Sequence, residues 1–206
     1  RVFLGLSHSL HRLYPDMSVP LAGLRAPFEE DRCFRWASAL RNLIWFDPDL
    51  KGEAWKAGSS YLPDAEWLVS RHQAAEAGEA EAVPFGFAAK CGHNGEPHNH
   101  NDVGHFLVWA DGQTYLADLG AGPYSKAYFG EDRYTLLCNG SQGHSVPIVN
   151  GRTQREGPEH AASEVAVGTD ADRVSFGMDL TRAYEDDGLQ RLTRRFEWNK
   201  RGEPPS

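Results

Sequence analysis

The sequence lacks the features of several common protein classes. No stretch of the 206-residue chain approaches the roughly 18 consecutive apolar residues of a membrane-spanning helix. Positive charge is also scarce, because 21 Lys and Arg residues face 29 Asp and Glu residues and the formal net charge is −8. Proteins that bind duplex nucleic acid normally carry the opposite sign. We therefore expect neither a membrane nor a nucleic acid as a partner.

Cysteine is scarce as well. Cys33, Cys91 and Cys138 lie far apart in the chain, and no two of them have the close spacing of a metal-binding or redox pair. An odd count of three excludes a complete disulfide framework and leaves room for one bridge at most. Buried free thiols are the expected state, and the cellular compartment stays open.

Turn-forming residues are plentiful, with 21 Gly and 12 Pro. Such a composition favours β structure. The clearest signal is Asp111-Gly112 between two apolar runs, since this dipeptide supplies the positive φ angles of a two-residue hairpin turn. Strands are expected at residues 83–90, 105–110, 113–118, 145–149, 165–167, 173–179 and 189–198. Sequential strands without crossover helices predict an antiparallel β-sandwich over residues 81–206.

Residues 1–80 are expected to be mostly helical. The clearest helix begins at Pro27, a residue suited to the first helical position, and ends before Asp47-Pro48. Its apolar residues recur at helical spacing and predict one buried face, made of Phe34, Ala37, Leu40, Leu43 and Ile44. The predicted fold class is therefore mainly β, an antiparallel β-sandwich preceded by a short α-helical segment.

Histidines gather in one short segment. Four of the nine lie between residues 93 and 105, among amide and carboxylate side chains. Such a segment is a poor core strand, because each buried polar group would need a partner, and it suits a metal or catalytic loop. In an extended chain His98, His100 and Asp102 project to one side. Zinc is the cation that best matches His and Asp ligands.

A zinc site needs further ligands from elsewhere in the chain. Asp118 ends the second hairpin strand, and His144 precedes the next expected strand, so two His and one Asp can leave a fourth position open. A two-residue turn at 111–112 would pair Asp118 with His105, which places His105 rather than His100 on the same face. A bend at Gly104 would break this alternation of side-chain directions. Both His100 and His105 therefore remain candidate ligands.

With these residues in view, the sequence resembles the heparinase II/III-like polysaccharide lyases over roughly residues 60–195. The likeness lies in linked motifs at residues 90–104, 117–124, 129–134, 141–144 and 150–157. It implies an α/α toroid followed by an antiparallel β-sandwich, with residues 1–80 as the end of the toroid. It also implies cleavage of a uronic-acid-containing polysaccharide or oligosaccharide by β-elimination, in which a base removes the C5 proton and an acid protonates the oxygen that leaves C4.

The resemblance assigns roles to individual residues. It implies that His98 acts as a general acid or base and that Tyr128 or Tyr134 is a catalytic tyrosine. The implied zinc would brace the loops of the site, and its implied ligands are His100, Asp118 and His144. The side chains expected to contact the substrate are Lys90, Asn94, Arg133 and Gln154.

The sequence also departs from the pattern of that family. The toroid normally supplies an Asn-His pair and a tyrosine, yet Asn42 is the single asparagine in residues 1–90, and Ser145 and His105 replace the Asn and the small residue that are common there. We therefore expect a segment of a longer protein that is inactive as a lyase by itself. Residues 81–160 carry five Lys or Arg against nine Asp or Glu, which favours a weakly sulfated glycan over heparin.

Two other functions fit parts of the sequence. A cupin-like metal enzyme would need a Glu several residues after the His pair, but the next one after His100 is Glu131. A non-catalytic carbohydrate-binding or metal-binding β-sandwich module is the stronger alternative, since six Trp and seven Tyr could include side chains that stack on sugars.

Overall fold

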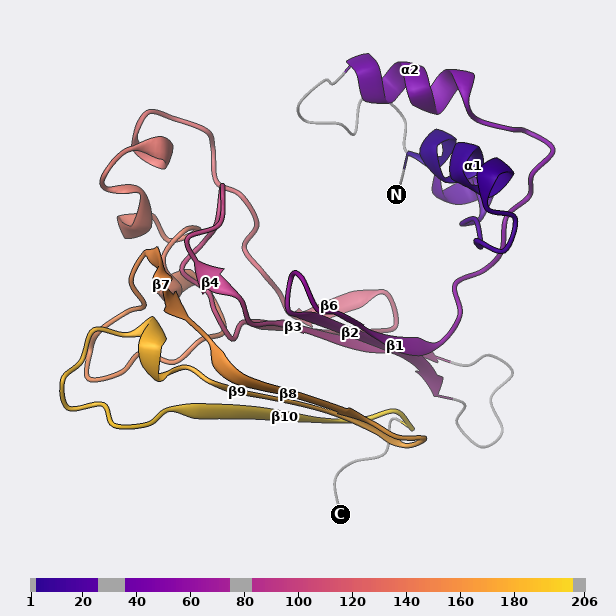
Figure 1. Ribbon diagram of the computed structural model, residues 1–206. Helices are drawn as coiled ribbons and strands as arrows, with labels where there is room; N and C mark the ends of the chain where they lie inside the picture. The colour runs from indigo at the N-terminus through magenta and orange to yellow at the C-terminus, as the bar shows by residue number, and fades with distance from the viewer. Residues whose placement is uncertain (1–2, 26–35, 75–82, 202–206) are drawn as a thin grey trace. The chain divides into compact units, whose positions relative to one another are not determined.

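The computed structural model describes residues 3–25, 36–74 and 83–201 (Figure 1). The chain divides into two units, Arg1–Lys56 and Ala57–Ser206. Within the described residues, no helix has the length and apolar character needed to cross a membrane.

The first unit contains two helices, α1 (Leu4–Leu13) and α2 (Trp36–Ile44), and a 3-10 turn at Ala22–Leu24. The helices approach closely at Gly5, where an added Cβ would lie 2.3 Å from the Arg41 carbonyl oxygen. Asn42 is buried at this crossing and its side chain accepts a hydrogen bond from the Gly5 backbone N–H at 3.1 Å. The one asparagine of this region therefore ties two helices together.

The predicted helix is confirmed in its second half. α2 ends at Ile44, before Asp47-Pro48, whereas its expected start at Pro27 lies outside the described residues. The predicted apolar face is not buried within the described part of the molecule, because Leu40, Leu43 and Ile44 are 47%, 67% and 70% exposed.

The second unit is built from antiparallel strands. A five-stranded sheet has the order β1-β2-β3-β5-β6, a three-stranded sheet has the order β10-β9-β8, and β4 pairs with β7. The strands are β1 (Gly58–Leu62), β2 (Trp67–Ala74), β3 (Val83–Lys90), β4 (His93–Asn94), β5 (Phe106–Ala110), β6 (Gln113–Leu116), β7 (Gly157–Ala161), β8 (Ser163–Thr169), β9 (Arg173–Asp179) and β10 (Thr193–Asn199). Short 3-10 turns lie at Ala127–Phe129, Arg133–Thr135, Ser141–Gly143 and Thr181–Ala183.

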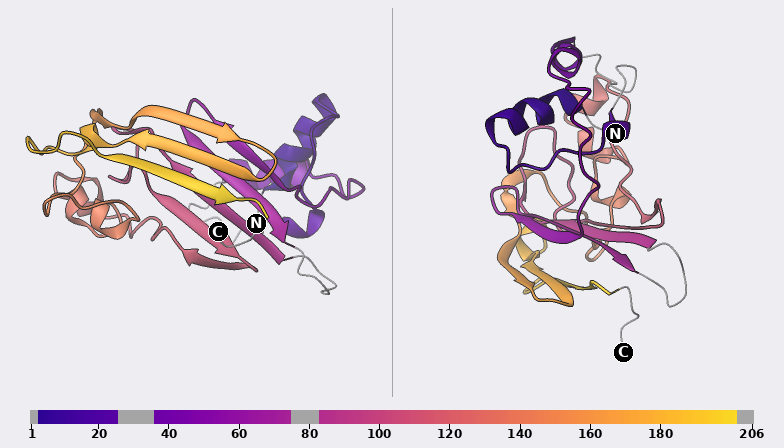
Figure 2. Two further views of the ribbon diagram at one scale, coloured as in Figure 1. Left: turned by 90° about the horizontal axis from the view of Figure 1, so that it is seen from below. Right: turned by 90° about the vertical axis from the view of Figure 1, so that its right-hand side faces the viewer.

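The two larger sheets pack face to face, as Figure 2 shows. Phe87 of β3 lies at the centre, with its ring 5.3 Å from that of Trp198 and 5.2 Å from that of Phe196 on β10. The fully buried residues Phe176 and Leu68 complete this contact from β9 and β2. Burying such aromatic and aliphatic surface is the main force that holds the sheets together. The predicted antiparallel β-sandwich is confirmed.

Residues 58–74 differ from the sequence expectation. They form β1 and β2, not the helical structure expected through residue 80, and they belong to the second unit. Alternate residues of β2, Leu68 and Ser70, are buried, as in a half-buried strand. The strands form because β2 pairs along its whole length with β3, a long-range contact that local helical propensity does not register.

The predicted hairpin is present, but an irregularity in its pairing changes which residues of the two strands lie opposite each other. Asp111 and Gly112 have φ angles of 49° and 70°, as the turn requires. Ala110 pairs with Gln113, but the register shifts between Val108 and Trp109. The simple alternation that would pair His105 with Asp118 therefore does not hold.

The strand expected at residues 145–149 does not form. Only the turn after it forms, at Asn150-Gly151, and an isolated bridge between Val149 and Arg152 closes this turn.

Candidate functional site

The histidine-rich segment leaves the sheet at the end of β3 and returns to it at the start of β5. Lys90 N–H donates to the His105 carbonyl at 3.1 Å, and Gly104 N–H donates to the Lys90 carbonyl at 3.0 Å. Gly104 has a φ of 85°, and an added Cβ would lie 2.9 Å from the Leu180 side chain, so glycine is required there. The expected bend at Gly104 is confirmed, and the residues between Lys90 and Gly104 form a loop.

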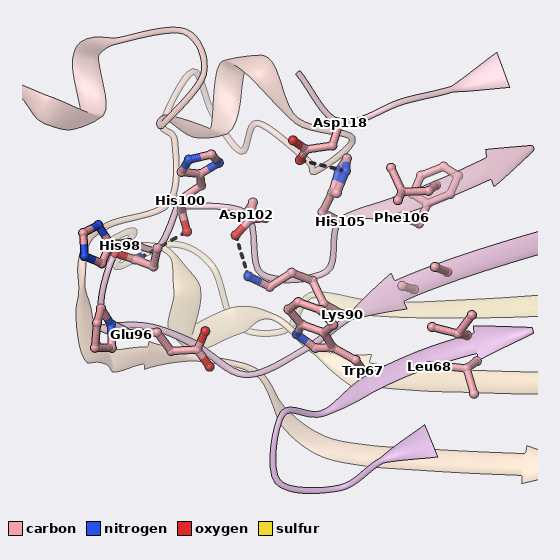
Figure 3. A pocket seen from close by; sticks show the side chains of 16 residues that line it. Trp67, Leu68, Lys90, Glu96, His98, His100, Asp102, His105, Phe106 and Asp118 are labelled. Atoms are coloured by element: carbon pink, nitrogen blue, oxygen red, sulfur yellow. Dashed lines mark hydrogen bonds and ion pairs between the residues drawn. The ribbon is translucent and has the colours of Figure 1, made fainter. Parts of the chain in front are cut away.

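Four polar side chains converge beside this loop, and we call His100, His105, Asp118 and His144 the Asp118 cluster. One ligand atom from each of His100, Asp118 and His144 lies within 4.8 Å of the others, so this group can hold a metal ion. Asp118 Oδ2 is 3.1 Å from His144 Nδ1 and 3.4 Å from His105 Nε2 (Figure 3 draws the contact with His105). The structure therefore brings together three residues far apart in the sequence, as predicted.

His144 has the hydrogen bonding of a metal ligand. Its Nε2 lies 3.2 Å from the Cys138 carbonyl oxygen, which can only accept, so Nε2 carries a proton. In the neutral ring Nδ1 then presents a lone pair to the Asp118 carboxylate, and this buried atom has no hydrogen-bond partner. A metal-bound histidine typically donates its other N–H to a carbonyl in this way. A cation between Nδ1 and Oδ2 would satisfy both atoms.

Electrostatics also suit a cation at the Asp118 cluster. The pKa of Asp118 is well below its usual range, chiefly because a protonated His144 Nδ1 donates to it and further because Gly120 N–H donates to Oδ1, although burial opposes the shift. A cation bound at the neutral Nδ1 would take the place of that proton. Burial lowers the pKa of His100 and of His105. An ionised carboxylate and unprotonated imidazoles are the forms that bind metals, so the residues present fit a zinc ion.

Tyr128 supports His100. Its ring is 2% exposed and its hydroxyl lies 3.3 Å from His100 Nε2. Burial raises the pKa of Tyr128, so the hydroxyl keeps its proton and is a neutral partner for the imidazole. A catalytic role for Tyr128 stays a prediction, since it is not among the residues that line the pocket described below.

Tyr134 and Arg133 hold Asn99, which lies between His98 and His100. The Tyr134 hydroxyl donates to Asn99 Oδ1 at 2.8 Å, and the Arg133 guanidinium donates to the Asn99 carbonyl. Asn99 Nδ2 in turn donates to the Asn94 carbonyl at 2.6 Å. These contacts hold the Asn99 backbone and side chain, and Asn99 itself lines the pocket described below, so it is a candidate site residue that the sequence did not single out. Its signal was its position between two candidate site histidines.

Gln154 joins the same loop to the rest of the sandwich. It is 2% exposed, and both the oxygen and the nitrogen of its side-chain amide form hydrogen bonds. We call Gln154 and the partners of its amide the Gln154 clasp. Oε1 accepts from Val103 N–H at 2.9 Å and from Asn94 Nδ2 at 3.1 Å, and Nε2 donates to the Val103 carbonyl at 2.8 Å and to the Tyr184 hydroxyl at 3.4 Å. Asn94 and Gln154 do not line the pocket. Their burial and hydrogen bonds give them a structural role, and the substrate contact expected for them stays a prediction.

A pocket of about 580 Å³ opens in front of the loop (Figure 3). Its lining includes His98, His100, His105, Asp118 and, from the start of β2, the 45% exposed Trp67. Trp67 is a second residue that the sequence reasoning missed, because the strand that carries it was not expected.

The pocket is poor in free positive charge. Of its lining residues in the described ranges, Lys90 is the one Lys or Arg, and its Nζ lies 2.8 Å from Asp102 Oδ1 in an ion pair (Figure 3). Glu96 and Asp118 add two further carboxylates. Three acidic side chains face one basic side chain in this pocket. A highly charged polyanion would be repelled here unless further positive charge were supplied.

His98 projects at the end of this pocket opposite the sheet strands (Figure 3). It is exposed, and its ring meets the Phe129 ring edge-on at 5.8 Å. Its φ of 60° lies in the left-handed region, which few non-glycine residues adopt and which often marks functional sites. The geometry therefore gives His98 access to a bound molecule.

Comparison with known proteins shows a shared fold. No protein-family profile and no curated protein matches the sequence. Among solved structures, the chain is similar to a mutant of the heparan sulfate lyase HepC from Pedobacter heparinus, with a TM-score of 0.58 and 15% sequence identity. The match covers 97% of this chain but 26% of that lyase, so the chain spans about a quarter of its length. At this identity the likeness establishes the fold alone.

Proposed function

We propose that the second unit forms one wall of the active site of a polysaccharide lyase that acts on uronic-acid-containing glycans. The observation that carries the proposal is the exposed His98 at a pocket lined by His100 and Asp118, two members of the group that His144 completes. The shared fold with a heparan sulfate lyase supports it. In this proposal the helices of the first unit belong to the end of an α/α toroid.

The proposed reaction is a β-elimination. A base takes the proton from C5 of the uronate, the electron pair forms the C4–C5 double bond, and the C4–O bond breaks as its oxygen receives a proton. His98 is the proposed acid or base, since an imidazole can do either near neutral pH. Asn99 and its partners hold the backbone on which His98 is carried. Positioning of this kind is essential, because a misplacement of about 1 Å can cost 100-fold in rate.

Zinc is the proposed metal, and His100, Asp118 and His144 would hold it. When bound, it would brace the loops and add positive charge beside the carboxylates of the pocket. The substrate proposed for such a weakly basic pocket is a uronate glycan with few sulfate groups.

The experiment uses the full-length protein that contains this sequence and a panel of unsulfated and sulfated uronate polymers. The unsaturated uronate product absorbs in the ultraviolet, and its formation is expected from at least one unsulfated polymer. His98→Ala should lower the rate about 100-fold or more. The matched control is His93→Ala, a histidine of the same segment that is not among the residues lining the pocket, which should retain the wild-type rate. No product from any polymer would contradict the proposal.

A non-catalytic sugar-binding module is the second candidate, and the exposed Trp67 in the pocket favours it. An indole face can stack on a sugar ring while its N–H stays hydrated. Calorimetry with uronate oligosaccharides would then show binding that Trp67→Ala removes, with no product formed and no dependence on His98.

A further inference from the structure

The three histidines around Asp118 are not equivalent, and His105 differs from the other two. Ser145 backbone N–H donates to His105 Nδ1 at 2.9 Å. A backbone amide can only donate, so Nδ1 must use its lone pair to accept. The proton of a neutral His105 therefore sits on Nε2, the nitrogen that faces Asp118.

This arrangement is the reverse of the one at His144. His144 donates from Nε2 to the Cys138 carbonyl and turns the lone pair of Nδ1 toward Asp118. His105 turns an N–H toward the same carboxylate oxygen, 3.4 Å away. The two rings meet edge-on with their centroids 5.2 Å apart, and both are buried. Two neighbouring imidazoles thus present opposite groups to Oδ2.

We propose that His105 is a positioning residue for the metal centre and not one of its ligands. In this proposal its Nε2–H faces Asp118 Oδ2 from one side, at 3.4 Å, while His144 Nδ1 and a metal ion take the other. The opposite oxygen, Oδ1, is held by Gly120 N–H. One oxygen of the carboxylate is thus held by a hydrogen bond, and the other is flanked by His105. This inference rests on the metal site of the proposed function and is independent of the lyase reaction.

The backbone around His105 explains why its ring keeps this direction. His105 N–H donates to the Asp102 carbonyl at 2.9 Å in the turn that ends the loop, and its carbonyl accepts from Lys90 N–H on β3. Ser145 in turn is held through its carbonyl by the Arg194 guanidinium at 2.7 Å. A ligand role would require Nε2 to lose its proton and Nδ1 to gain one, which would leave Ser145 N–H facing another N–H.

The direct test is the position of the imidazole protons in the 206-residue chain labelled with ¹⁵N-histidine. Long-range ¹H–¹⁵N spectra should show His105 protonated at Nε2 both without metal and with Zn²⁺. With ¹¹³Cd²⁺ in place of zinc, coupling to ¹⁵N should appear at His100 and His144 and not at His105. A coupling from ¹¹³Cd to His105, or a proton at its Nδ1, would overturn the proposal.

Two substitutions test the function of the N–H. His105→Gln keeps a donor that can reach Asp118 and an oxygen that can accept from Ser145 N–H, whereas His105→Leu has a similar size and neither group. Zinc affinity, measured by competition with a chelator, should fall about 10- to 100-fold for His105→Leu and much less for His105→Gln. Equal losses in the two variants would show that His105 acts only through packing.

The outcomes separate this inference from the proposed function. If the chain binds neither Zn²⁺ nor Cd²⁺, the proposed metal site fails, and the metal-free spectrum still decides whether His105 is protonated at Nε2. If His105→Leu does not fold, the spectra of the unaltered chain decide alone. A missing lyase activity changes neither result.

Discussion

The Gln154 side chain and the Asp118 cluster lie in the same sandwich, yet they differ in how completely their buried polar atoms are satisfied. Every donor and acceptor position of the Gln154 amide meets a protein group. In the Asp118 cluster, His144 Nδ1 lies buried beside Asp118 Oδ2 without a hydrogen-bond partner, and His105 Nε2 faces the same oxygen at 3.4 Å without forming a hydrogen bond. Unpaired buried polar atoms are costly. A satisfied amide serves folding, whereas an unpaired imidazole nitrogen beside a carboxylate is an arrangement that can hold a metal ion.

The largest expected effect is on zinc affinity, when candidate ligands of the Asp118 cluster are replaced. It tests whether this cluster, unlike the Gln154 clasp, binds a metal. Asp118→Asn, His100→Ala and His144→Ala should each lower zinc affinity by more than about 100-fold, because loss of a residue that only supports a ligand already costs 10- to 100-fold. Metal analysis of the purified protein measures this. Asp102→Asn is the control, since Asp102 pairs with Lys90 in the same pocket and lies outside the metal-binding group. Stoichiometric zinc in all three variants would place the site elsewhere.

The next effect concerns the clasp. Gln154→Leu should lower the free energy of unfolding by about 3 kcal/mol, because it leaves Val103 N–H and the Asn94 amide without acceptors in a buried site. Urea denaturation measures the change. Zinc should still bind to the folded fraction of this variant with nearly unchanged affinity. An unchanged free energy of unfolding would mean that the clasp does not stabilise the loop.

Metal removal gives a slightly smaller effect on stability. Zinc at 100 times its dissociation constant should stabilise the chain by about 2.7 kcal/mol, since it binds the folded state alone. A chelator should abolish this gain in the unaltered chain and should leave the denaturation midpoint of Asp118→Asn where it was. A chelator-dependent shift in that variant would separate the stabilising metal from the Asp118 cluster.

The smallest effect tests whether Tyr134 positions the loop. Tyr134→Phe removes the hydrogen bond to Asn99 Oδ1 and should cost about 1 kcal/mol of stability. If the hydroxyl only holds Asn99, the elimination rate of the full-length protein should change little. A fall in rate of about 100-fold with a normal denaturation midpoint would instead make Tyr134 the catalytic tyrosine.

Parts of the structure that depend only on residues adjacent in the sequence can be predicted from the sequence alone. The turn at Asp111-Gly112 forms as predicted because those residues adopt positive φ angles at low cost. The strands at 83–90 and 173–179 match the predicted ranges, and α2 ends before Asp47-Pro48 for the local reason given. Residue chemistry and the family resemblance also predicted His100, Asp118 and His144 as metal ligands. The structure brings these three side chains together.

Other features depended on contacts between residues far apart in the chain. β1 and β2 exist because β3 offers a partner, and the register shift at Val108 and Trp109 arises within a paired hairpin. The buried position of Gln154 and the proton position on His105 each depend on a backbone group more than 30 residues away, Val103 for Gln154 and Ser145 for His105. A sequence determines which groups can donate, accept or bind a metal. The folded chain alone decides which of them are left facing one another, because that depends on packing distances that no local propensity encodes.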